Sequence, residues 1–186
     1  IQIVPASGRA STCLPHQLRA APLLFRYAIT SNGARVDDVR GHCLFCQEIY
    51  PDTALSLLSD CQTLRIGVSA HICREYLLQG RLLQMMGKAV YGKDADQARC
   101  VPDLRPLIKQ SRGAEELQFY FFSRTAREAL RQILSYYPTL NAAYSSSYVE
   151  IFSTEASKGK ALSALAQHLH LDRSQIACIG DSENDL

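Results

Sequence analysis

The sequence predicts an α/β fold in which a core formed by both ends of the chain is interrupted by an α+β segment. At each end a short apolar run leads into a loop of small or acidic residues: residues 1–4 precede Ser7-Gly8-Arg9, and residues 176–179 precede Gly180-Asp181. Buried parallel strands of α/β sheets lead into loops in this way. The residues between the ends alternate more loosely and carry more charge, which is typical of partly exposed antiparallel strands.

The first half of the chain shows apolar runs and apolar stripes in turn. Strands are predicted where apolar residues run together or alternate, and helices where they recur every three or four positions. The Asn32-Gly33 pair predicts a turn, because both residues tolerate a positive φ angle. On these grounds we expect strands at 1–4, 27–30, 36–49 and 64–68, and helices at 14–25, 55–61 and 74–86.

The second half begins with an irregular stretch, residues 88–113, which is expected to be mainly loop. The aromatic run at 117–122 predicts a strand whose side chains pack between sheet and helix. Further along we expect a helix at 125–137, two short strands within 144–152 separated by Ser145-Ser146-Ser147, a helix from Ser157 and a buried strand at 176–179.

The composition is that of an ordinary globular chain. Of the 186 residues, 47% are hydrophobic, which is enough for a sizeable core. The formal net charge of +2 argues against binding to nucleic acid or to an anionic membrane through bulk charge. No apolar run is long enough to cross a bilayer, so we expect no membrane partner. Seven irregularly spaced cysteines are typical of reduced thiols, which indicates a cytoplasmic protein.

The C-terminal loop carries the densest group of polar ligands. Asp181 follows the apolar run 176–179, Asp185 lies four residues later, and Asn184 stands beside it. Two carboxylates and an amide at the end of a strand form the hard-oxygen donor set that suits Mg²⁺. The alternative is a polar turn that caps a following helix, with Asp181 or Ser182 as the N-cap.

Two other segments have the chemistry to bind phosphate. Lys158 and Lys160 stand at a predicted helix start, where backbone N–H groups and the helix dipole favour an anion. The alternative there is a solvated lysine pair. Ser7 and Gly8 offer a hydroxyl and backbone N–H groups in a loop after the first apolar run, although an ordinary turn has the same composition.

The order of these pieces resembles the haloacid dehalogenase (HAD) superfamily of phosphohydrolases, and in particular its Cof-like branch with a type IIB cap. The resemblance extends over the whole chain, although residues 36–145 match only in the order of their elements. It implies a Rossmann-like α/β core at residues 1–34 and 154–186, with an inserted α+β cap at 35–153. Four strings carry it, in the family's order: Ala6-Ser7-Gly8-Arg9, Thr30-Ser31-Asn32-Gly33-Ala34, Glu150-Ile151-Phe152 leading to Ser157-Lys158-Gly159, and Gly180-Asp181-Ser182-Glu183-Asn184-Asp185.

The resemblance also implies which residues bind phosphate. Ser7 and the Gly8 backbone would hold the phosphate, and Asn184 would reach it with its amide. Lys158 would neutralise its charge and steady the nucleophile. In such enzymes an aspartate attacks phosphorus and forms an aspartyl-phosphate, which water then hydrolyses.

For the metal, the resemblance implies Mg²⁺ bound by Asp181, with Asp185 as a supporting carboxylate near the ion. Asp181 and Lys158 are therefore the expected catalytic residues. Together the Mg²⁺ and the lysine would offset the charge of the phosphoryl oxygens in the transition state.

One departure from the family is large. The first motif, Asp-x-Asp-Gly-Thr, supplies the nucleophile, the general acid/base and a metal ligand, and it is absent: no aspartate precedes Asp37. We therefore expect the chain to be a fragment, incomplete at both ends, that does not hydrolyse phosphate esters by itself.

For the intact parent we expect a Mg²⁺-dependent phosphatase of small phosphorylated metabolites, such as sugar phosphates or phosphorylated cofactors. Two alternatives remain: a phosphomutase or phosphotransferase on the same core, and a non-catalytic protein that binds a phosphorylated ligand. No motif indicates the substrate or the oligomeric state.

A Cys-x-x-Cys pair, Cys43 and Cys46, raises the separate question of zinc. A zinc site needs two more ligands, and the nearest candidates have no paired spacing: Cys61, His71 and Cys73. We therefore favour half-buried thiols on a strand.

Overall fold

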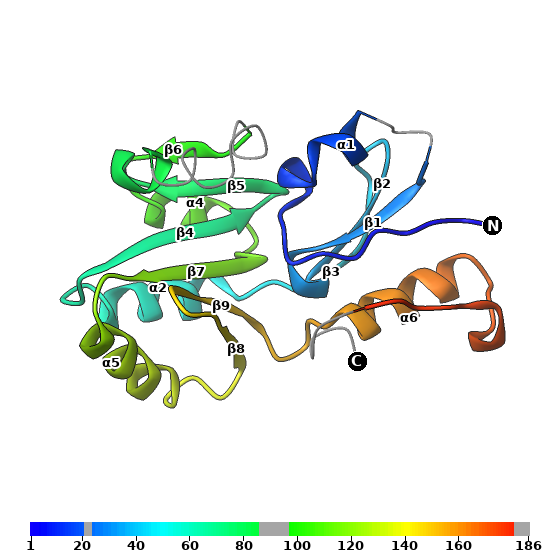
Figure 1. Cartoon of the computed structure of the whole chain (residues 1–186). Coiled ribbons are helices and arrows are strands. Elements are labelled where there is room, and N and C mark those ends of the chain that lie inside the picture. The colour runs from blue at the N-terminus through cyan, green and yellow to red at the C-terminus, as the bar shows by residue number, and fades with distance from the viewer. Residues whose placement is uncertain (21–23, 86–96, 181–186) are drawn as a thin grey trace.

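The computed structural model describes residues 1–20, 24–85 and 97–180 of the chain. The strands form two sheets, one of three strands and one of six, which lie side by side (Figure 1). The chain passes from the smaller sheet to the larger one through residues 47–50 and returns through residues 154–157. None of the described helices has the length and hydropathy of a membrane span.

The smaller sheet is antiparallel, with strand order β1-β2-β3. Helix α6 packs on it, and Ala161 and Leu165, one turn apart on that helix, are buried against Ile29 and Val36. The elements of this half are β1 (Tyr27–Thr30), β2 (Arg35–Asp38), β3 (Cys43–Cys46), α6 (Lys158–His168) and the short helices η1 (Ser11–Cys13), α1 (His16–Arg19), η2 (Ser31–Gly33) and η4 (Arg173–Gln175).

The larger sheet has the order β6-β5-β4-β7-β9-β8, and only the β5–β6 pair is parallel. Three of the described helices in this half of the molecule pack against this sheet, and residues 81–85 form a further helical segment. Its elements are α2 (Pro51–Asp60), β4 (Ile66–Ile72), β5 (Glu75–Gln79), β6 (Arg99–Val101), α4 (Arg105–Gln110), β7 (Glu116–Phe121), α5 (Arg124–Leu134), β8 (Leu140–Tyr144) and β9 (Tyr148–Ser153).

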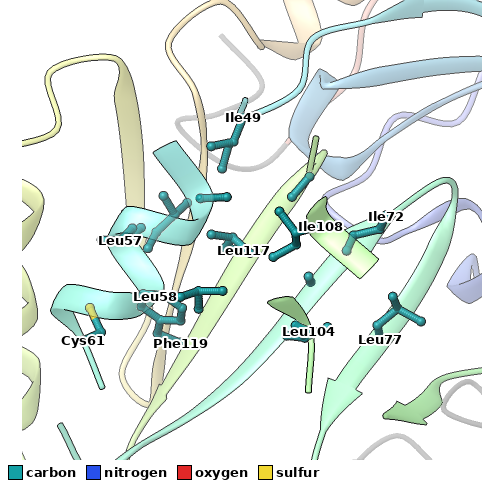
Figure 2. Packing of buried hydrophobic residues seen from close by; sticks show 14 of the residues in the cluster. Ile49, Leu57, Leu58, Cys61, Ile72, Leu77, Leu104, Ile108, Leu117 and Phe119 are labelled. Carbon is teal, nitrogen blue, oxygen red and sulfur yellow. The ribbon is translucent and has the colours of Figure 1, made fainter. Parts of the chain in front are cut away.

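The main hydrophobic core lies between one face of the larger sheet and these three helices. Leu117 and Phe119 of β7 are completely buried there, together with Leu57 of α2 and Ile108 of α4 (Figure 2). Leu130 of α5 is buried in the same core. Burial of each such side chain stabilises the fold by about 1.5–3 kcal/mol. This core holds the three helices against one face of the larger sheet.

The opposite face of the larger sheet is polar. Side chains alternate between the faces of a strand, so Glu116, Gln118 and Tyr120 point away from the core that receives Leu117 and Phe119. The strand register places further residues of β4, β5 and β9 beside them. We call this set the polar face: Ser69, His71, Tyr76, Glu116, Gln118, Tyr120, Tyr148 and Glu150.

Most predicted elements are confirmed to within a few residues. These are the strands at 27–30, 64–68 and 117–122, the second of the two strands predicted within 144–152, the helices at 55–61 and 125–137, and the helix that begins after Ser157. The first strand of that pair lies earlier than predicted, at Leu140–Tyr144. The predicted strand at 36–49 is a pair of strands, β2 and β3, joined by a turn. Of the helix predicted at 14–25, only α1 forms, and residues 21–23 lie outside the described residues.

The helix predicted at 74–86 is wrong over residues 75–79, which form strand β5. Cys73 and Arg74 both have positive φ, 49° and 76°, and this two-residue turn folds β5 back against β4. Leu77 and Leu78 are both buried, one on each face of the sheet. Two neighbouring apolar residues fit one face of a helix, and they fit equally well a strand that is buried on both faces.

The strands predicted at the two ends of the chain, residues 1–4 and 176–179, are wrong too. Residues 1–4 form no regular strand: Ile3 makes a single parallel bridge to Phe25, and Ala6 makes one to Ile29. Residues 176–180 are not a strand, and the Ile179 side chain is fully exposed. A strand needs a neighbour for its backbone hydrogen bonds, and no other described segment pairs with residues 176–180.

The division into core and cap at residue 34 stays a prediction. Strand pairing groups β2 and β3 with β1, whereas the six-stranded sheet and its helices occupy residues 51–153. The strand pairing favours a first boundary between core and cap within residues 47–50 and not at residue 34.

Candidate functional site

The site is organised by the turn that follows β1. Ser31, Asn32 and Gly33 have φ angles of 51°, 54° and 88°, so three consecutive residues are left-handed. Only glycine adopts this conformation without cost, and asparagine does so more readily than most residues. Position 33 requires glycine for a second reason, because a β carbon there would lie 2.3 Å from the backbone nitrogen of Lys158. The turn therefore lies against the start of α6.

The loop of Ser7 is attached to the same turn. The backbone N–H of Ser7 donates to Ile29 O at 2.9 Å, and the N–H of Asn32 donates to Ser7 O at 3.3 Å. The N–H of Arg9 donates to Ser7 Oγ at 3.1 Å, which fixes the hydroxyl oxygen in a tight local turn. A β carbon on Gly8 would lie 3.1 Å from Asn32 Oδ1.

The start of α6 provides the third piece. Ser157 is the N-cap, and its Oγ accepts a hydrogen bond from the N–H of Lys160 at 3.0 Å. The Lys160 ammonium group is paired with Glu155 at 3.1 Å. The first turn contains no acidic residue, so its N–H groups and Lys158 present positive charge next to the turn of Gly33.

The Asn32 side chain connects this region to the polar face of the larger sheet. Asn32 Nδ2 donates to Glu116 Oε2 at 2.9 Å and to Glu150 Oε2 at 2.8 Å. Gln118 Nε2 donates to the other oxygen of Glu116 at 2.6 Å. Two carboxyl groups from neighbouring strands thus share one amide nitrogen.

Burial and mutual repulsion disfavour two charges at this carboxyl pair. Burial and the neighbouring Glu150 hold the pKa of Glu116 well above its ordinary value. Burial also raises the pKa of Glu150, although the Asn32 hydrogen bond and the Lys158 charge favour its ionised form. Both shifts favour the protonated carboxyl, and the upward shift is the larger at Glu116.

Ser31 links the turn to the sheet a second time. Its hydroxyl is hydrogen-bonded to Nδ1 of His71 on β4 at 2.9 Å and donates to Glu115 at 3.4 Å. Burial lowers the pKa of His71 to about 3, so this imidazole is neutral at physiological pH. The turn is therefore fixed by side chains from three adjacent strands, β4, β7 and β9.

A buried ion-pair network borders the turn on its other side. Arg35 Nε contacts Asp37 at 2.8 Å, and Arg35 Nη1 contacts Glu115 at 3.0 Å. Arg74, in the turn between β4 and β5, contacts Asp37 at 3.2 Å, and Ser11 Oγ donates to the same carboxylate at 3.0 Å. These contacts join the two sheets next to the candidate site.

The structure brings together part of the predicted site. Ser7, Gly8 and Lys158 all lie around the turn of residues 31–33, as their assignment to one phosphate requires. Asp181, Asn184 and Asp185 lie outside the described residues. Their assignment to the metal and to the phosphate therefore stays a prediction.

Sequence reasoning missed three residues that hold the site in place. Asn32 and Glu150 belong to the strings that carry the family resemblance, but Asn32 was given no role beyond the turn and Glu150 none. Glu116 was not singled out. A signal was present: Glu116 and Gln118 alternate with Leu117 and Phe119, which indicates a strand with one polar face. The prediction that the aromatic run packs between sheet and helix is confirmed for Phe119, which is fully buried, and for Phe121, which is half-buried against the same core. Tyr120 lies on the polar face, and Phe122 is exposed.

The Cys-x-x-Cys pair does not form a zinc site among the described residues. Cys43 lies exposed at the start of β3. Cys46 has its sulfur within 4.8 Å of carboxylate oxygens of Glu48 and Glu115. Glu115, however, is already paired with Arg35, and burial raises the pKa of the Cys46 thiol, which disfavours the thiolate that a metal needs.

The chain is similar to proteins of one family. The family model described as haloacid dehalogenase-like hydrolase matches residues 1–186. No curated protein matches the chain in sequence.

Solved structures show the same fold. A haloacid dehalogenase-like hydrolase from B. subtilis is 21% identical, with a TM-score of 0.77 and coverage of 100% of this chain and 73% of its own. A haloacid dehalogenase-like hydrolase from Bacteroides thetaiotaomicron is 16% identical, with a TM-score of 0.82 and coverage of 100% and 71%. A HAD subclass IIB sugar phosphatase is 13% identical, with a TM-score of 0.72 and coverage of 92% and 64%.

Proposed function

Because this chain belongs to the haloacid dehalogenase-like hydrolase family, we propose that the whole protein is a Mg²⁺-dependent phosphatase of small phosphorylated metabolites. The observation that carries the proposal is the convergence of the Ser7–Gly8 loop and the start of α6 on the turn of Asn32 and Gly33. Each piece alone is an ordinary local structure. In this proposal they bring a hydroxyl, backbone N–H groups and a lysine to one phosphate group, which is the chemistry that its binding requires.

In this proposal Ser7 and Lys158 have different tasks. The Ser7 oxygen is fixed by the N–H of Arg9, so its proton can be donated to a phosphoryl oxygen. Lys158 supplies a full positive charge at a helix N-terminus, where an anion is already favoured. Charge that develops on the phosphoryl group during transfer is stabilised by such preorganised donors.

The proposed metal ligands are Asp181 and Asp185, two carboxylates of the kind that Mg²⁺ prefers. Bound Mg²⁺ would polarise the phosphoryl group and offset its negative charge. The 186 residues contain no aspartate before Asp37, so in this proposal the nucleophile that forms the aspartyl-phosphate is not among them.

The leaving group would face the larger sheet, which we propose as the cap. The similarity to a subclass IIB sugar phosphatase supports sugar phosphates as the first substrates to test. We place the protein in the cytoplasm, and the absence of disulfides among its seven cysteines supports this.

The test is the release of inorganic phosphate from sugar phosphates and p-nitrophenyl phosphate by the whole protein, in Mg²⁺ and in EDTA. We expect Mg²⁺-dependent hydrolysis that is lost in Asp181→Ala and in Lys158→Ala. Phosphate binding without turnover would instead support the non-catalytic alternative. Transfer to an added alcohol would support the phosphotransferase.

A further inference from the structure

Asn32 lies where the Ser7 loop, the start of α6 and the larger sheet meet. Its backbone N–H donates to Ser7 O, and its side-chain oxygen lies against Gly8. Its neighbour Gly33 touches the peptide that precedes Lys158. One residue thus contacts, directly or through the next position, both segments that we assign to phosphate binding.

Two glutamates fix the Asn32 side chain from the opposite direction. Nδ2 donates to Glu116 at 2.9 Å and to Glu150 at 2.8 Å, which uses both amide protons. This arrangement turns Oδ1 toward Gly8. Glu116 has no exposed surface and receives a further hydrogen bond from Gln118, so its position does not depend on solvent.

A role in the turn alone does not account for this arrangement. A left-handed turn needs an asparagine only for its backbone, and this requires no carboxyl group. Burying two carboxyl groups side by side is costly, because each disfavours ionisation of the other. The pair is understandable if the orientation of Asn32 has a purpose beyond the turn.

We propose that Asn32 is a positioning residue for phosphate binding: held by Glu116 and Glu150, it sets the Ser7–Gly8 loop and the start of α6 at the separation that one phosphate group requires. The inference rests on the proposed function. It adds to the proposed site a residue that acts through Ser7 and through Lys158.

The charged and titratable groups around Asn32 determine how the proposal is tested. Glu116 on β7 and Glu150 on β9 face its side chain, and Lys158 on α6 faces Glu150. His71 on β4 and Glu115 face the adjoining Ser31. An ionised aspartate at position 32 would donate no hydrogen bond to the pair and would repel it, whereas a protonated one could donate a single bond.

The experiment is calorimetric titration of the folded chain with inorganic phosphate at pH 5 and pH 8, with each variant compared with wild type at the same pH. Asn32→Ala should weaken binding about tenfold at both values. Asn32→Asp should weaken it about threefold at pH 5 and by more than about thirtyfold at pH 8. The matched control is Asn141→Asp on β8, an exposed asparagine, which should stay within about twofold.

A merely structural contribution of Asn32 would give a loss that does not change with pH in Asn32→Asp. That result, or wild-type affinity in both Asn32 variants, would overturn the inference while leaving the phosphate site intact. Failure of the wild-type chain to bind phosphate would overturn the proposed function as well. Circular dichroism at each pH confirms that the variants are folded, and Asn32→Ala tests the inference without an added charge.

Discussion

Gly33 faces Ser157 so closely that a β carbon on the glycine would lie 2.1 Å from the carbonyl carbon of the serine. The two residues are far apart in the sequence, and their contact joins the turn after β1 to the first turn of α6. Any side chain at position 33 would separate the two segments that the phosphate site needs together.

Gly33→Ala should therefore destabilise the fold and weaken phosphate binding. The positive φ of 88° costs an alanine about 1–2 kcal/mol, and the backbone contact with Ser157 adds to this. We expect a loss of at least about 3 kcal/mol in the free energy of unfolding, measured by urea denaturation.

Gly80→Ala is the matched control for this prediction. Gly80 has a similar φ of 86° but nothing within 4 Å of its β-carbon position. It should lose only about 1 kcal/mol and keep its phosphate affinity. Equal losses in the two variants would show that the contact with Ser157 does not matter.

Ser157→Ala should cost about 1 kcal/mol, because it removes the side-chain cap of α6. Ser123→Ala removes the equivalent cap of α5, where the hydroxyl accepts from the N–H of Ala126, and should cost a similar amount. Of these two N-cap serines, only Ser157 lies at the candidate site. We expect weaker phosphate binding in Ser157→Ala alone, and an equal effect in both variants would argue against a site at α6.

The neutral His71 should make stability depend on pH. The unfolded chain binds a proton at this histidine below about pH 6.5, whereas the folded chain does so only near pH 3. The free energy of unfolding therefore decreases as the pH falls from about 6.5 to about 3, and this histidine accounts for at most about 5 kcal/mol of the decrease.

His71→Asn retains a polar atom near Nδ1 but removes the titration. We expect its free energy of unfolding to fall less steeply between pH 7 and pH 4 than that of the wild type. His170→Asn, at an exposed left-handed position, should leave the slope unchanged. A wild-type slope in His71→Asn would contradict the assignment of a buried neutral imidazole.

Arg35→Met should destabilise the junction of the two sheets by about 3 kcal/mol, because it leaves Asp37 and Glu115 buried without their main cation. Arg99→Met breaks a pair of similar length with Glu75, but both of those side chains are about half exposed. That control should lose less than about 1 kcal/mol in urea unfolding. Similar losses would mean that the Arg35 pair is not effectively buried.

The sequence was informative wherever local pattern decides structure. The Asn32-Gly33 turn, the capped start of α6 and the apolar stripe of α5 follow from turn chemistry, capping and helical spacing. The grouping of Ser7 with Lys158 came from the order of motifs in a family resemblance. Spacing alone left both segments with ordinary explanations.

What could not be predicted depends on contacts between distant residues. The turn at Cys73 and Arg74 has no typical turn residues, so β5 was taken for a helix. The apolar residues 176–179 satisfy the pattern of a buried strand, but a strand also needs a partner, which no pattern within the segment reveals. Asn32, Glu116 and Glu150 meet only when β7 and β9 pair.

The most direct test of the account is titration of the folded chain with inorganic phosphate, comparing Lys158→Gln with Lys160→Gln. The two lysines share one helical turn, but Lys160 is paired with Glu155, whereas Lys158 is adjacent to the Gly33 turn. We predict that the wild type binds phosphate, that Lys158→Gln weakens binding about tenfold or more, and that Lys160→Gln changes it less than about threefold. Absence of wild-type binding, or equal effects of the two substitutions, would contradict a phosphate site built on Ser7, Asn32 and Lys158.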